Sequence, residues 1–437
     1  MTSKKLIPQN YYRLPWSLTD NGISWLEITD ACNLACEGCY RPHINKHKTL
    51  QEIHEDLMVF KAKRKSDCIS IAGGDPLMHP QIVEVVKMIA SMGWKPILNT
   101  NGVALTAKLL KQLKAAGVAG FTFHIDTTQV RADSPASTEK EHNHLRLKLA
   151  KMLAAEGGIS CSFNQTVSID TLNQIPDVVE WAKKFPDIVH TIVFILFRSP
   201  KLTGEFDFWA NGKKINLGDT YEKTSWGGKR LLTAQDVADK IREVEPLYEP
   251  NGYLNGSCDA DSFKWLLSTR VCSKKETFGY AGPRFMELVQ HIHHLLYGRW
   301  ISYSSPSYLS TGRSSTLLFS LFDSKMRVAL KRMVSSFLKN PLNIFRTSYL
   351  QTFTIIQPVD MMSDGRMNMC DSCPDLTVHK GELYWSCRLE EIKEFGCFVN
   401  AVPKSSVRDQ EYKEDQEKLI KNPTIIEDKV EQNILIL

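Results

Sequence analysis

The sequence predicts an α/β protein made of parallel βα units, and three observations support this fold class. Six short runs rich in β-branched and apolar residues, typical of strands, lie between residues 23 and 197. Segments with helical spacing of apolar residues separate them, and such alternation is typical of a parallel sheet. Cysteine, glycine, asparagine and aspartate occur where these strands end, which is where barrel folds carry their chemistry. These units either close into a barrel or form an open, doubly wound sheet.

The predicted strands come in a regular order. They lie at residues 23–30, 67–76, 94–102, 119–128, 158–167 and 187–197. Between them, residues 105–117 and 175–185 are predicted helices with apolar positions three and four residues apart. Gly117 marks the end of the first of these helices.

The bulk composition predicts a globular protein of more than one structural unit. The chain has 437 residues, of which 43% are hydrophobic and 24% charged, with a net charge of +5. This charge is too small to predict nucleic-acid binding. No secretory signal is visible, and the longest uncharged apolar run, residues 188–197, is far shorter than the ~20 residues of a spanning helix. We expect a cytoplasmic protein whose 11 cysteines are not disulfides.

Three cysteines lie close together in the stretch "DACNLACEGCYRPH", with the spacing C-x3-C-x2-C. Three thiolates in a compact loop suit a metal centre. A [4Fe–4S] cluster with three protein ligands leaves one iron open for a small molecule. A structural zinc site needs four ligands, and His43 or His47 could complete it. The residues of interest are Cys32, Cys36 and Cys39.

The segment "CNLACEGCY", directly after a strand, resembles the signature of the radical S-adenosylmethionine (radical SAM) family. The resemblance implies that Cys32, Cys36 and Cys39 hold a [4Fe–4S] cluster whose open iron binds S-adenosylmethionine. It also implies reductive cleavage to a 5′-deoxyadenosyl radical, which removes a hydrogen atom from a substrate. The resemblance covers about residues 23–200 and implies a partial (β/α)6 TIM-type barrel.

The stretch "AGGDP" after the second strand resembles the glycine-rich loop of the same family, which lies against the methionine ammonium. The residues implied in cofactor binding are Gly73, Gly74, Asp75 and Pro76. Two positions depart from the family pattern. Asp75 stands where glutamate is usual, and Gly38 precedes the third cysteine where an aromatic residue is common, so Tyr40 is the candidate contact.

Alternation along two neighbouring strands predicts polar rows inside the barrel. His124 and Asp126 share one row, as a pair that could orient a proton acceptor or bind ribose hydroxyls. Asn164 lies in the other row, and Arg198 ends the sixth strand, where it could meet the cofactor carboxylate. Ordinary polar filling of a barrel and a surface arginine are the alternatives.

A second cysteine group follows the pattern C-x2-C-x13-C-x9-C. Its members are Cys370, Cys373, Cys387 and Cys397. The spacing is compatible with zinc or with a second [4Fe–4S] cluster. The position and the CxxCP start resemble the auxiliary-cluster extensions of radical SAM proteins, so we favour one iron–sulfur cluster. Cys397 is the uncertain ligand, and Cys68, Cys161, Cys258 and Cys272 are not expected to bind metal.

Residues 299–347 form a basic insert. Their net charge is +7 in a chain of net charge +5. Residues 315–339 are predicted to be one amphipathic helix. Its apolar positions are Leu318, Phe322, Met326, Ala329, Met333 and Phe337. Such a helix either binds an anionic membrane surface or packs on the barrel with a solvated basic face.

The predicted organisation has six regions. They are an N-terminal tail (1–22), the partial barrel (23–200), a connecting helical region (201–298), the basic insert (299–347), the cysteine-rich region (348–403) and a charged tail (404–437). Within the connecting region, residues 233–270 are expected to form short helices.

These features predict a radical SAM enzyme that acts on a C–H bond, with a flavodoxin- or ferredoxin-type electron donor. An apolar lipid or isoprenoid is the substrate hypothesis, and a ribosomal peptide is its alternative. Two other classes stay open. One is a non-catalytic zinc-binding scaffold, and the other is a dithiol redox protein that uses Cys370 and Cys373.

Overall fold

The computed structural model describes residues 4–37, 39, 44–198, 206–217 and 231–404. All six predicted strands are present and form one continuous parallel array, in the order β2 to β7. They are β2 (Ile23–Thr29), β3 (Cys68–Gly73), β4 (Lys95–Thr100), β5 (Gly120–His124), β6 (Ser160–Val167) and β7 (Thr191–Leu196). The α/β class and the parallel βα arrangement are therefore confirmed.

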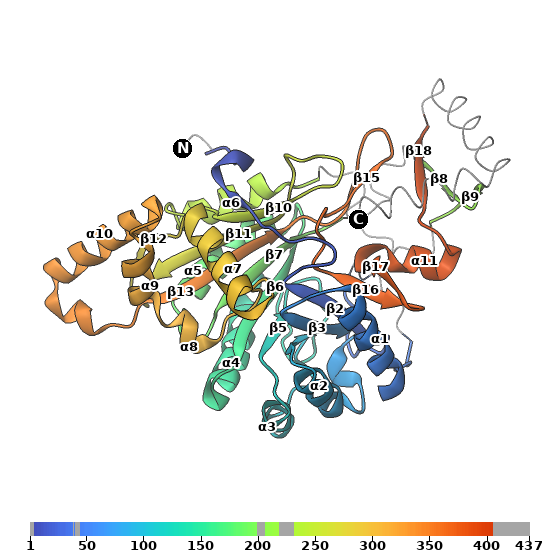
Figure 1. Cartoon of the computed structure of the whole chain (residues 1–437), viewed down its shortest axis with the longest axis horizontal. Coiled ribbons are helices and arrows are strands. Elements are labelled where there is room, and N and C mark those ends of the chain that lie inside the picture. Colours follow the sequence, from blue (N-terminus) through green and yellow to red (C-terminus); the bar gives the residue numbers. More distant parts are fainter. Residues whose placement is uncertain (1–3, 38, 40–43, 199–205, 218–230, 405–437) are drawn as a thin grey trace.

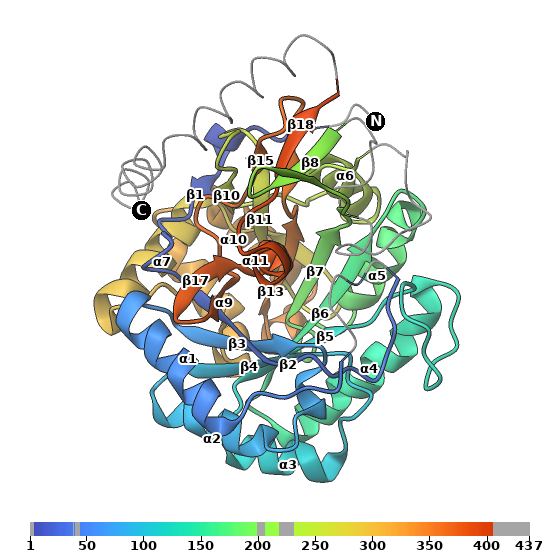
Figure 2. The same cartoon turned by 90° about the vertical axis from the view of Figure 1, so that its right-hand side faces the viewer.

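Helices line one face of this array, as Figures 1 and 2 show. They are α1 (Leu50–Lys63), α2 (Ile82–Ser91), α3 (Ala107–Ala115), α4 (Glu139–Glu156) and α5 (Ile175–Lys183). The main core lies between helices and strands. Phe121, Phe123 and Phe163 are fully buried in it, with neighbouring ring centroids 5.4 and 5.6 Å apart. Because strand residues alternate between faces, the polar rows with Thr122 and His124 lie on the opposite, interior face.

The sheet continues beyond β7 with strands from other parts of the chain. The added strands are β13 (Tyr349–Ile356), β11 (Phe263–Cys272), β10 (Gly252–Asn255), β1 (Tyr12–Arg13) and, beside β11, β12 (Thr277–Tyr280). β13 runs parallel to β7, and β11 runs antiparallel to β13. The predicted N-terminal tail and the start of the cysteine-rich region thus contribute strands to the barrel sheet.

The helices expected over residues 233–270 are wrong except for α6 (Ala234–Val244). The rest of this segment forms β10 and most of β11. β11 lies between β10 and β13, and most of its side chains are buried on both faces. A strand that is buried on both faces lacks the alternation of polar and apolar residues by which strands are recognised in a sequence.

The connecting region also contains a hairpin of β8 (Phe206–Ala210) and β9 (Lys213–Ile215). Its turn is Asn211-Gly212, with φ of 49° and 72°. Asn-Gly is the strongest short hairpin signal in a sequence, and it could have identified this turn. β18 (Asn400–Pro403) pairs with β8.

The remaining elements lie around this sheet. They are α7 (Pro283–Tyr297), α8 (Pro306–Leu309), α9 (Gly312–Phe319), α10 (Ser324–Lys339), β14 (Asp360–Met361), β15 (Met367–Asn368), β16 (Leu376–His379), β17 (Glu382–Trp385) and α11 (Leu389–Phe395). None of the described helices is long and apolar enough to cross a membrane. Of the predicted charged tail, residues 405–437 lie outside the described residues.

The basic insert differs from its prediction, because the expected single helix is divided into α9 and α10. Asp323 causes the division. Its buried carboxylate caps α10 by accepting a hydrogen bond from Met326 N at 2.9 Å. Met326, Ala329 and Met333 are buried against β12 as predicted, whereas Leu318 and Phe322 are 57% and 58% exposed.

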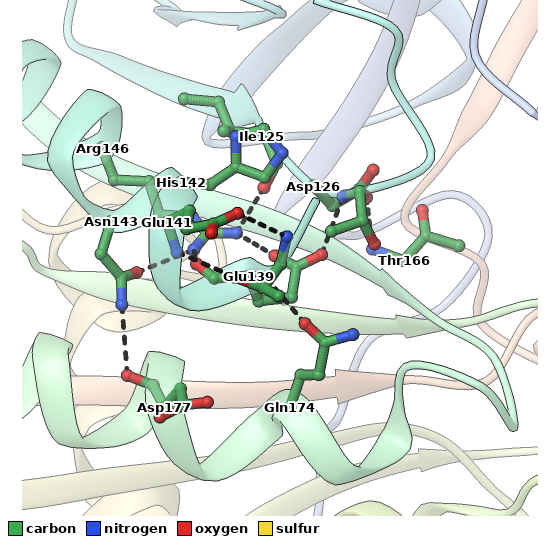
Figure 3. Close-up of polar contacts among 12 residues, drawn as sticks. Ile125, Asp126, Glu139, Glu141, His142, Asn143, Arg146, Thr166, Gln174 and Asp177 are labelled. Carbon is green, nitrogen blue, oxygen red and sulfur yellow. Dashed lines mark hydrogen bonds and ion pairs between the residues drawn. The ribbon is translucent and has the colours of Figure 1, made fainter. Parts of the chain in front are cut away.

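A buried ion pair fixes the start of α4 to the loop after β5 (Figure 3). Glu139 and Arg146 pair within α4, and their side chains are 0% and 1% exposed. Glu139 Oε1 accepts from Thr127 N at 2.8 Å, while Arg146 Nη2 donates to Ile125 O at 2.6 Å. Burial raises the pKa of Glu139, and the charge of Arg146 opposes that rise.

We predict that Arg146→Met lowers the free energy of unfolding by about 3–5 kcal/mol, because it leaves the Glu139 carboxylate buried without its counter-charge. Urea denaturation followed by circular dichroism measures this loss. The matched variant is Arg146→Met with Glu139→Gln, whose neutral amide can still accept from Thr127 N. The free energy of unfolding of this double variant should fall clearly less than that of the single Arg146→Met variant. Equal losses in the two variants would contradict the ion-pair explanation.

Candidate functional site

The loop after β2 carries the first cysteine group at the carboxyl edge of the parallel sheet. Thr29, the last residue of β2, fixes the start of this loop, because its Oγ1 accepts from Ala31 N at 3.0 Å and donates to Lys46 O at 3.0 Å. His47 Nδ1 lies 2.8 Å from the same Oγ1, and the His47 ring packs edge-on against His79. His47 Nδ1 thus helps to hold the start of the cysteine loop. His43 lies outside the described residues.

The three thiols of this loop lie within electrostatic reach of one another. The pKa of Cys36 is raised to about 12, chiefly by burial and also by the negative forms of Asp126, Cys39 and Cys32. Burial also raises the pKa of Cys32. A bound cation would reverse these shifts, since thiolate ligands are deprotonated by the metal. Three soft thiol donors in one loop therefore fit an iron–sulfur cluster.

In the described part of the chain, no three His, Cys, Asp or Glu side chains converge into a closed metal site. All eleven cysteines are free thiols. The assignment of individual cluster ligands stays a prediction.

The Gly73-Gly74 loop packs directly on the backbone that precedes the cysteines. A Cβ at Gly73, where φ is +133°, would lie 2.1 Å from Thr29 O, and one at Gly74 would lie 2.3 Å from Ala31 O. Gly74 N donates to Thr29 O at 2.7 Å, and Asp75 N donates to Ala31 O at 2.8 Å. Only glycine allows this approach. The structure therefore brings together the two motifs that the sequence singled out.

The Asp75 carboxylate is buried and braces β3 to β4. It accepts hydrogen bonds from Leu77 N at 2.9 Å, from Asn101 N at 2.8 Å and from Thr100 Oγ1 at 2.8 and 2.9 Å. Burial raises its pKa, and these donors oppose the rise. Pro76 begins the short 3-10 helix that follows. The contact of Asp75 with a cofactor ammonium stays a prediction.

His124 and Asp126 do form a pair. His124 Nε2 lies 2.7 Å from Asp126 Oδ2. Burial is the largest single influence on the pKa of His124 and lowers it, but the charge and hydrogen bond of Asp126, together with the charge of Glu139, raise it above its ordinary value. Asp126 is fully buried and also accepts from Thr128 N at 3.0 Å and Thr166 N at 2.7 Å. Asp126 is thus placed to hold His124 and the loop after β5. His124, whose side chain is 36% exposed, is the member that can meet a ligand.

Asn164 lies beside His124 in the next strand, as the β5–β6 register requires. Its Oδ1 is buried without a hydrogen-bond partner among the described residues, and so is Ser162 Oγ on the same strand face. Unsatisfied polar atoms on the interior face are a usual sign of a ligand or ordered water that the protein expects there. Asn164 therefore keeps its predicted role as a cofactor-binding candidate.

Arg198 is less favourably placed for its predicted role. Arg198 forms an ion pair with Asp360, and its Nη2 donates to Leu232 O at 2.6 Å. Asp360 also pairs with the buried Lys264 at 2.7 Å. The Arg198 guanidinium is thus occupied by the protein itself, which differs from the predicted contact with a cofactor carboxylate. Tyr40 lies outside the described residues.

The second cysteine group packs against the barrel. Burial raises the pKa of Cys373 well above its usual value, and the charges of Cys370, Asp375 and Cys387 add to this. Cys370, Cys373 and Cys387 therefore lie near one another, with Cys373 buried and the other two half-buried. Arg64, at the end of α1, donates to Cys373 O at 2.8 Å and fixes the motif to the barrel.

The fourth position of this group is less defined. Cys397 follows α11 and Gly396, and its role as a ligand stays a prediction. The backbone of Gly256 pairs with that of Cys370 in an isolated antiparallel β-bridge. This pairing places Cys258, two residues after Gly256, near the CxxC motif, which the sequence spacing alone did not reveal. Cys258 Sγ lies 3.4 Å from Met367 O.

Sequence reasoning also missed three residues near the first cysteines: Asn101, Gln129 and Arg131. Asn101 Nδ2 lies 3.9 Å from Cys32 Sγ, and Gln129 bridges to Cys36 across a short antiparallel contact. Arg131 donates to both Asn101 O and Gln129 Oε1. No local pattern marks Gln129 or Arg131. Asn101 was visible only as part of a turn after the third strand.

Comparisons with known proteins point to one family. Residues 26–194 match the family described as the radical SAM superfamily. The chain is 26% identical over 187 residues to "AdoMet-dependent heme synthase" of Methanosarcina barkeri, covering 40% of this chain and 50% of that protein. It is 28% identical over 197 residues to "GTP 3',8-cyclase" of Aquifex aeolicus, covering 42% and 58%. The chain thus spans about half the length of the curated relatives it matches.

Among solved structures, Streptococcus suis SuiB bound to its precursor peptide SuiA is similar, with a TM-score of 0.34 and 15% identity over 44% of this chain and 42% of SuiB. The match to the family lies on β2 to β7, and it includes the cysteine loop and the Gly73-Gly74 loop. Residues 26–194 of this chain therefore form a radical SAM domain.

Proposed function

We propose that this protein is a radical SAM enzyme that removes a hydrogen atom from a substrate C–H bond. One observation carries the proposal: inside the matched residues, the cysteine loop after β2 packs on the Gly73-Gly74 backbone with no room for a side chain. Cys32, Cys36 and Cys39 would hold a [4Fe–4S] cluster. When bound, the cluster and S-adenosylmethionine supply the 5′-deoxyadenosyl radical.

The other residues of the site would bind and orient. The glycine loop presents backbone rather than side chains to the methionine end of the cofactor. Asn164 Oδ1, buried and unsatisfied among the described residues, would accept from a cofactor or substrate donor. His124, held by Asp126, would present its ring to the same interior space. A flavodoxin- or ferredoxin-type protein would deliver the electron.

The C-terminal cysteines would hold a second [4Fe–4S] cluster. Cys370, Cys373 and Cys387 lie near one another, and a dithiol redox role does not fit them, because burial raises their thiol pKa values where a reactive cysteine needs a lowered one. Structural zinc is the alternative for this site.

The proposed substrate class rests on an exposed apolar surface of the protein. The names of the relatives describe different substrates, so they do not select one for this chain. Exposed apolar residues gather on α9, α10 and the turn that follows α10, at the opposite end of the molecule from β8 and β18 in Figure 1. They are Leu317, Leu318, Leu321, Phe322, Leu338, Leu342, Ile344 and Phe345, which are between 48% and 84% exposed.

This surface is also basic. Lys325, Lys331, Arg332 and Lys339 are exposed on α10, while Asp323, the only acidic residue between 299 and 347, is buried as a helix cap. Apolar side chains surrounded by cations, without exposed acids, are complementary to an anionic lipid surface. We propose that this surface docks on a membrane and that the substrate is an apolar lipid or isoprenoid. A ribosomal peptide is the alternative substrate.

We predict that Cys32→Ala, Cys36→Ala and Cys39→Ala each abolish the formation of 5′-deoxyadenosine from S-adenosylmethionine and dithionite under anaerobic conditions. An open iron requires all three thiolates. Chromatography of the nucleoside product measures the reaction. Cys161→Ala, which changes a buried strand cysteine, is the matched control and should keep the activity. Full cleavage by any one of the first three variants would disprove the ligand assignment.

We predict that the triple variant of Cys370, Cys373 and Cys387 to alanine binds about four fewer irons per chain than the wild type, which is the content of one [4Fe–4S] cluster. Iron, sulfide and zinc analysis of anaerobically reconstituted protein measures the difference. Cys272→Ala, at a buried position in β11, should leave the iron unchanged. A loss of zinc at constant iron would show structural zinc instead.

We predict that the wild type sediments with vesicles of phosphatidylglycerol and that Lys331→Glu with Arg332→Glu and Lys339→Glu abolishes this binding. Each cation near an anionic surface contributes about 1 kcal/mol, and added salt should weaken the binding. Leu321→Ser with Phe322→Ser should weaken it by removing apolar burial.

The control for charge is Lys108→Glu with Lys111→Glu, which alters exposed lysines on α3. This variant should bind as the wild type does. If the wild type does not bind these vesicles at low salt, the membrane proposal is wrong and the peptide substrate is favoured.

A further inference from the structure

Two side-chain amides lie beside the sulfurs of the first cysteine group. We infer that Asn101 and Gln129 are positioning residues that donate N–H···S hydrogen bonds to Cys32 and Cys36 and thereby raise the reduction potential of the bound cluster. This inference rests on the proposed cluster, because a potential exists only where the cluster is bound. Asn101 follows β4 and Gln129 follows β5, so both come from the carboxyl edge of the sheet.

The orientation of the Asn101 amide follows from its hydrogen bonds. Its Oδ1 accepts from Val103 N at 2.9 Å, so the other end of the amide is the donor. Nδ2 donates to Asn33 Oδ1 at 2.7 Å and lies 3.9 Å from Cys32 Sγ. An amide nitrogen has two hydrogens, so one serves Asn33 and the other is available to the sulfur.

The Gln129 amide is oriented in the same way. Its Oε1 accepts from Arg131 Nη1 at 2.9 Å, and its Nε2 donates to His124 O at 3.0 Å. The second hydrogen of Nε2 is available to Cys36, which is the direct partner of Gln129 in a short antiparallel bridge. Glu37 N donates to Thr128 O at 2.8 Å and holds the two segments together.

One buried guanidinium connects these two donors. Arg131 Nη1 donates to Asn101 O at 3.0 Å as well as to Gln129 Oε1. Asp133 holds Arg131 by hydrogen bonds of 3.0 and 2.9 Å, and the Arg131 side chain is 0% exposed. A buried arginine with defined hydrogen-bond partners adopts a single side-chain conformation. It therefore fixes which end of the Gln129 amide faces the cysteines and holds the backbone of Asn101 beside it.

The effect on the cluster has a definite sign. Reduction adds a negative charge to the cluster, and an N–H dipole aimed at a sulfur stabilises that charge, so each such bond raises the potential.

The test is a redox titration of the full-length, anaerobically reconstituted protein, followed by electron paramagnetic resonance. The signal to follow is the one that changes when S-adenosylmethionine is added, because only a cluster with an open iron responds to it. Asn101→Ala and Gln129→Met each remove one donor. Asn99→Ala is the matched control, since its amide donates to Ser70 Oγ at 2.7 Å and Ile71 O at 3.3 Å on the neighbouring strand.

We expect both donor variants to be several-fold less reduced than the wild type at a fixed potential, where a tenfold change corresponds to about 59 mV for one electron. The control should titrate as the wild type does. Resonance Raman gives a second readout, because the shift of iron–sulfur stretching bands in D2O should shrink in the donor variants and persist in Asn99→Ala.

The outcomes separate this inference from the proposed function. A wild type without a signal that responds to S-adenosylmethionine would disprove the proposed cluster. A normal signal with unchanged potentials in both donor variants would overturn the inference alone. Failure of both variants to bind iron while folded would also overturn it, because the amides would then be required for assembly and would not tune an assembled cluster.

Discussion

The close contact between the loops after β2 and β3 is the constraint on which the site depends. Gly73 and Gly74 place their backbone where any Cβ would collide with Thr29 O or Ala31 O. Two backbone hydrogen bonds, of 2.7 and 2.8 Å, close the same contact. The start of the cysteine loop is therefore held against the sheet edge by main-chain atoms, which leave little conformational freedom. A larger residue would move the cysteines and the cofactor surface together.

From this contact, buried polar groups connect each strand end to the next. Asp75 joins β3 to β4 through Thr100 and Asn101. Arg131 joins Asn101 to the loop after β5, and Asp126 joins that loop to β6 through Thr166 N. Buried charges are costly unless they are paired, so these connections form one rigid rim. The same rim holds Asn101 and Gln129 beside the cysteine loop.

The C-terminal cysteine region is built into this frame. β13 lies in the main sheet beside β7, and Arg64 of α1 holds the backbone of Cys373 and Pro374. Arg13, before the barrel, pairs with Asp371. The second cysteine group is therefore attached to the same sheet that carries the first. The basic apolar surface of α9 and α10 is a separate feature, attached through the buried face of Met326, Ala329 and Met333.

The sequence by itself determined the six parallel strands, the cysteine loop and the glycine loop, because strand runs, turn residues and metal-ligand spacing are local patterns. Only the tertiary structure decided that β11 and β13 extend the sheet, that Asp323 divides the basic insert into two helices, and that Asp360 occupies Arg198. It also decided that Gln129 faces Cys36. These features depend on pairing between segments far apart in the chain, and no periodicity within one segment encodes its partner.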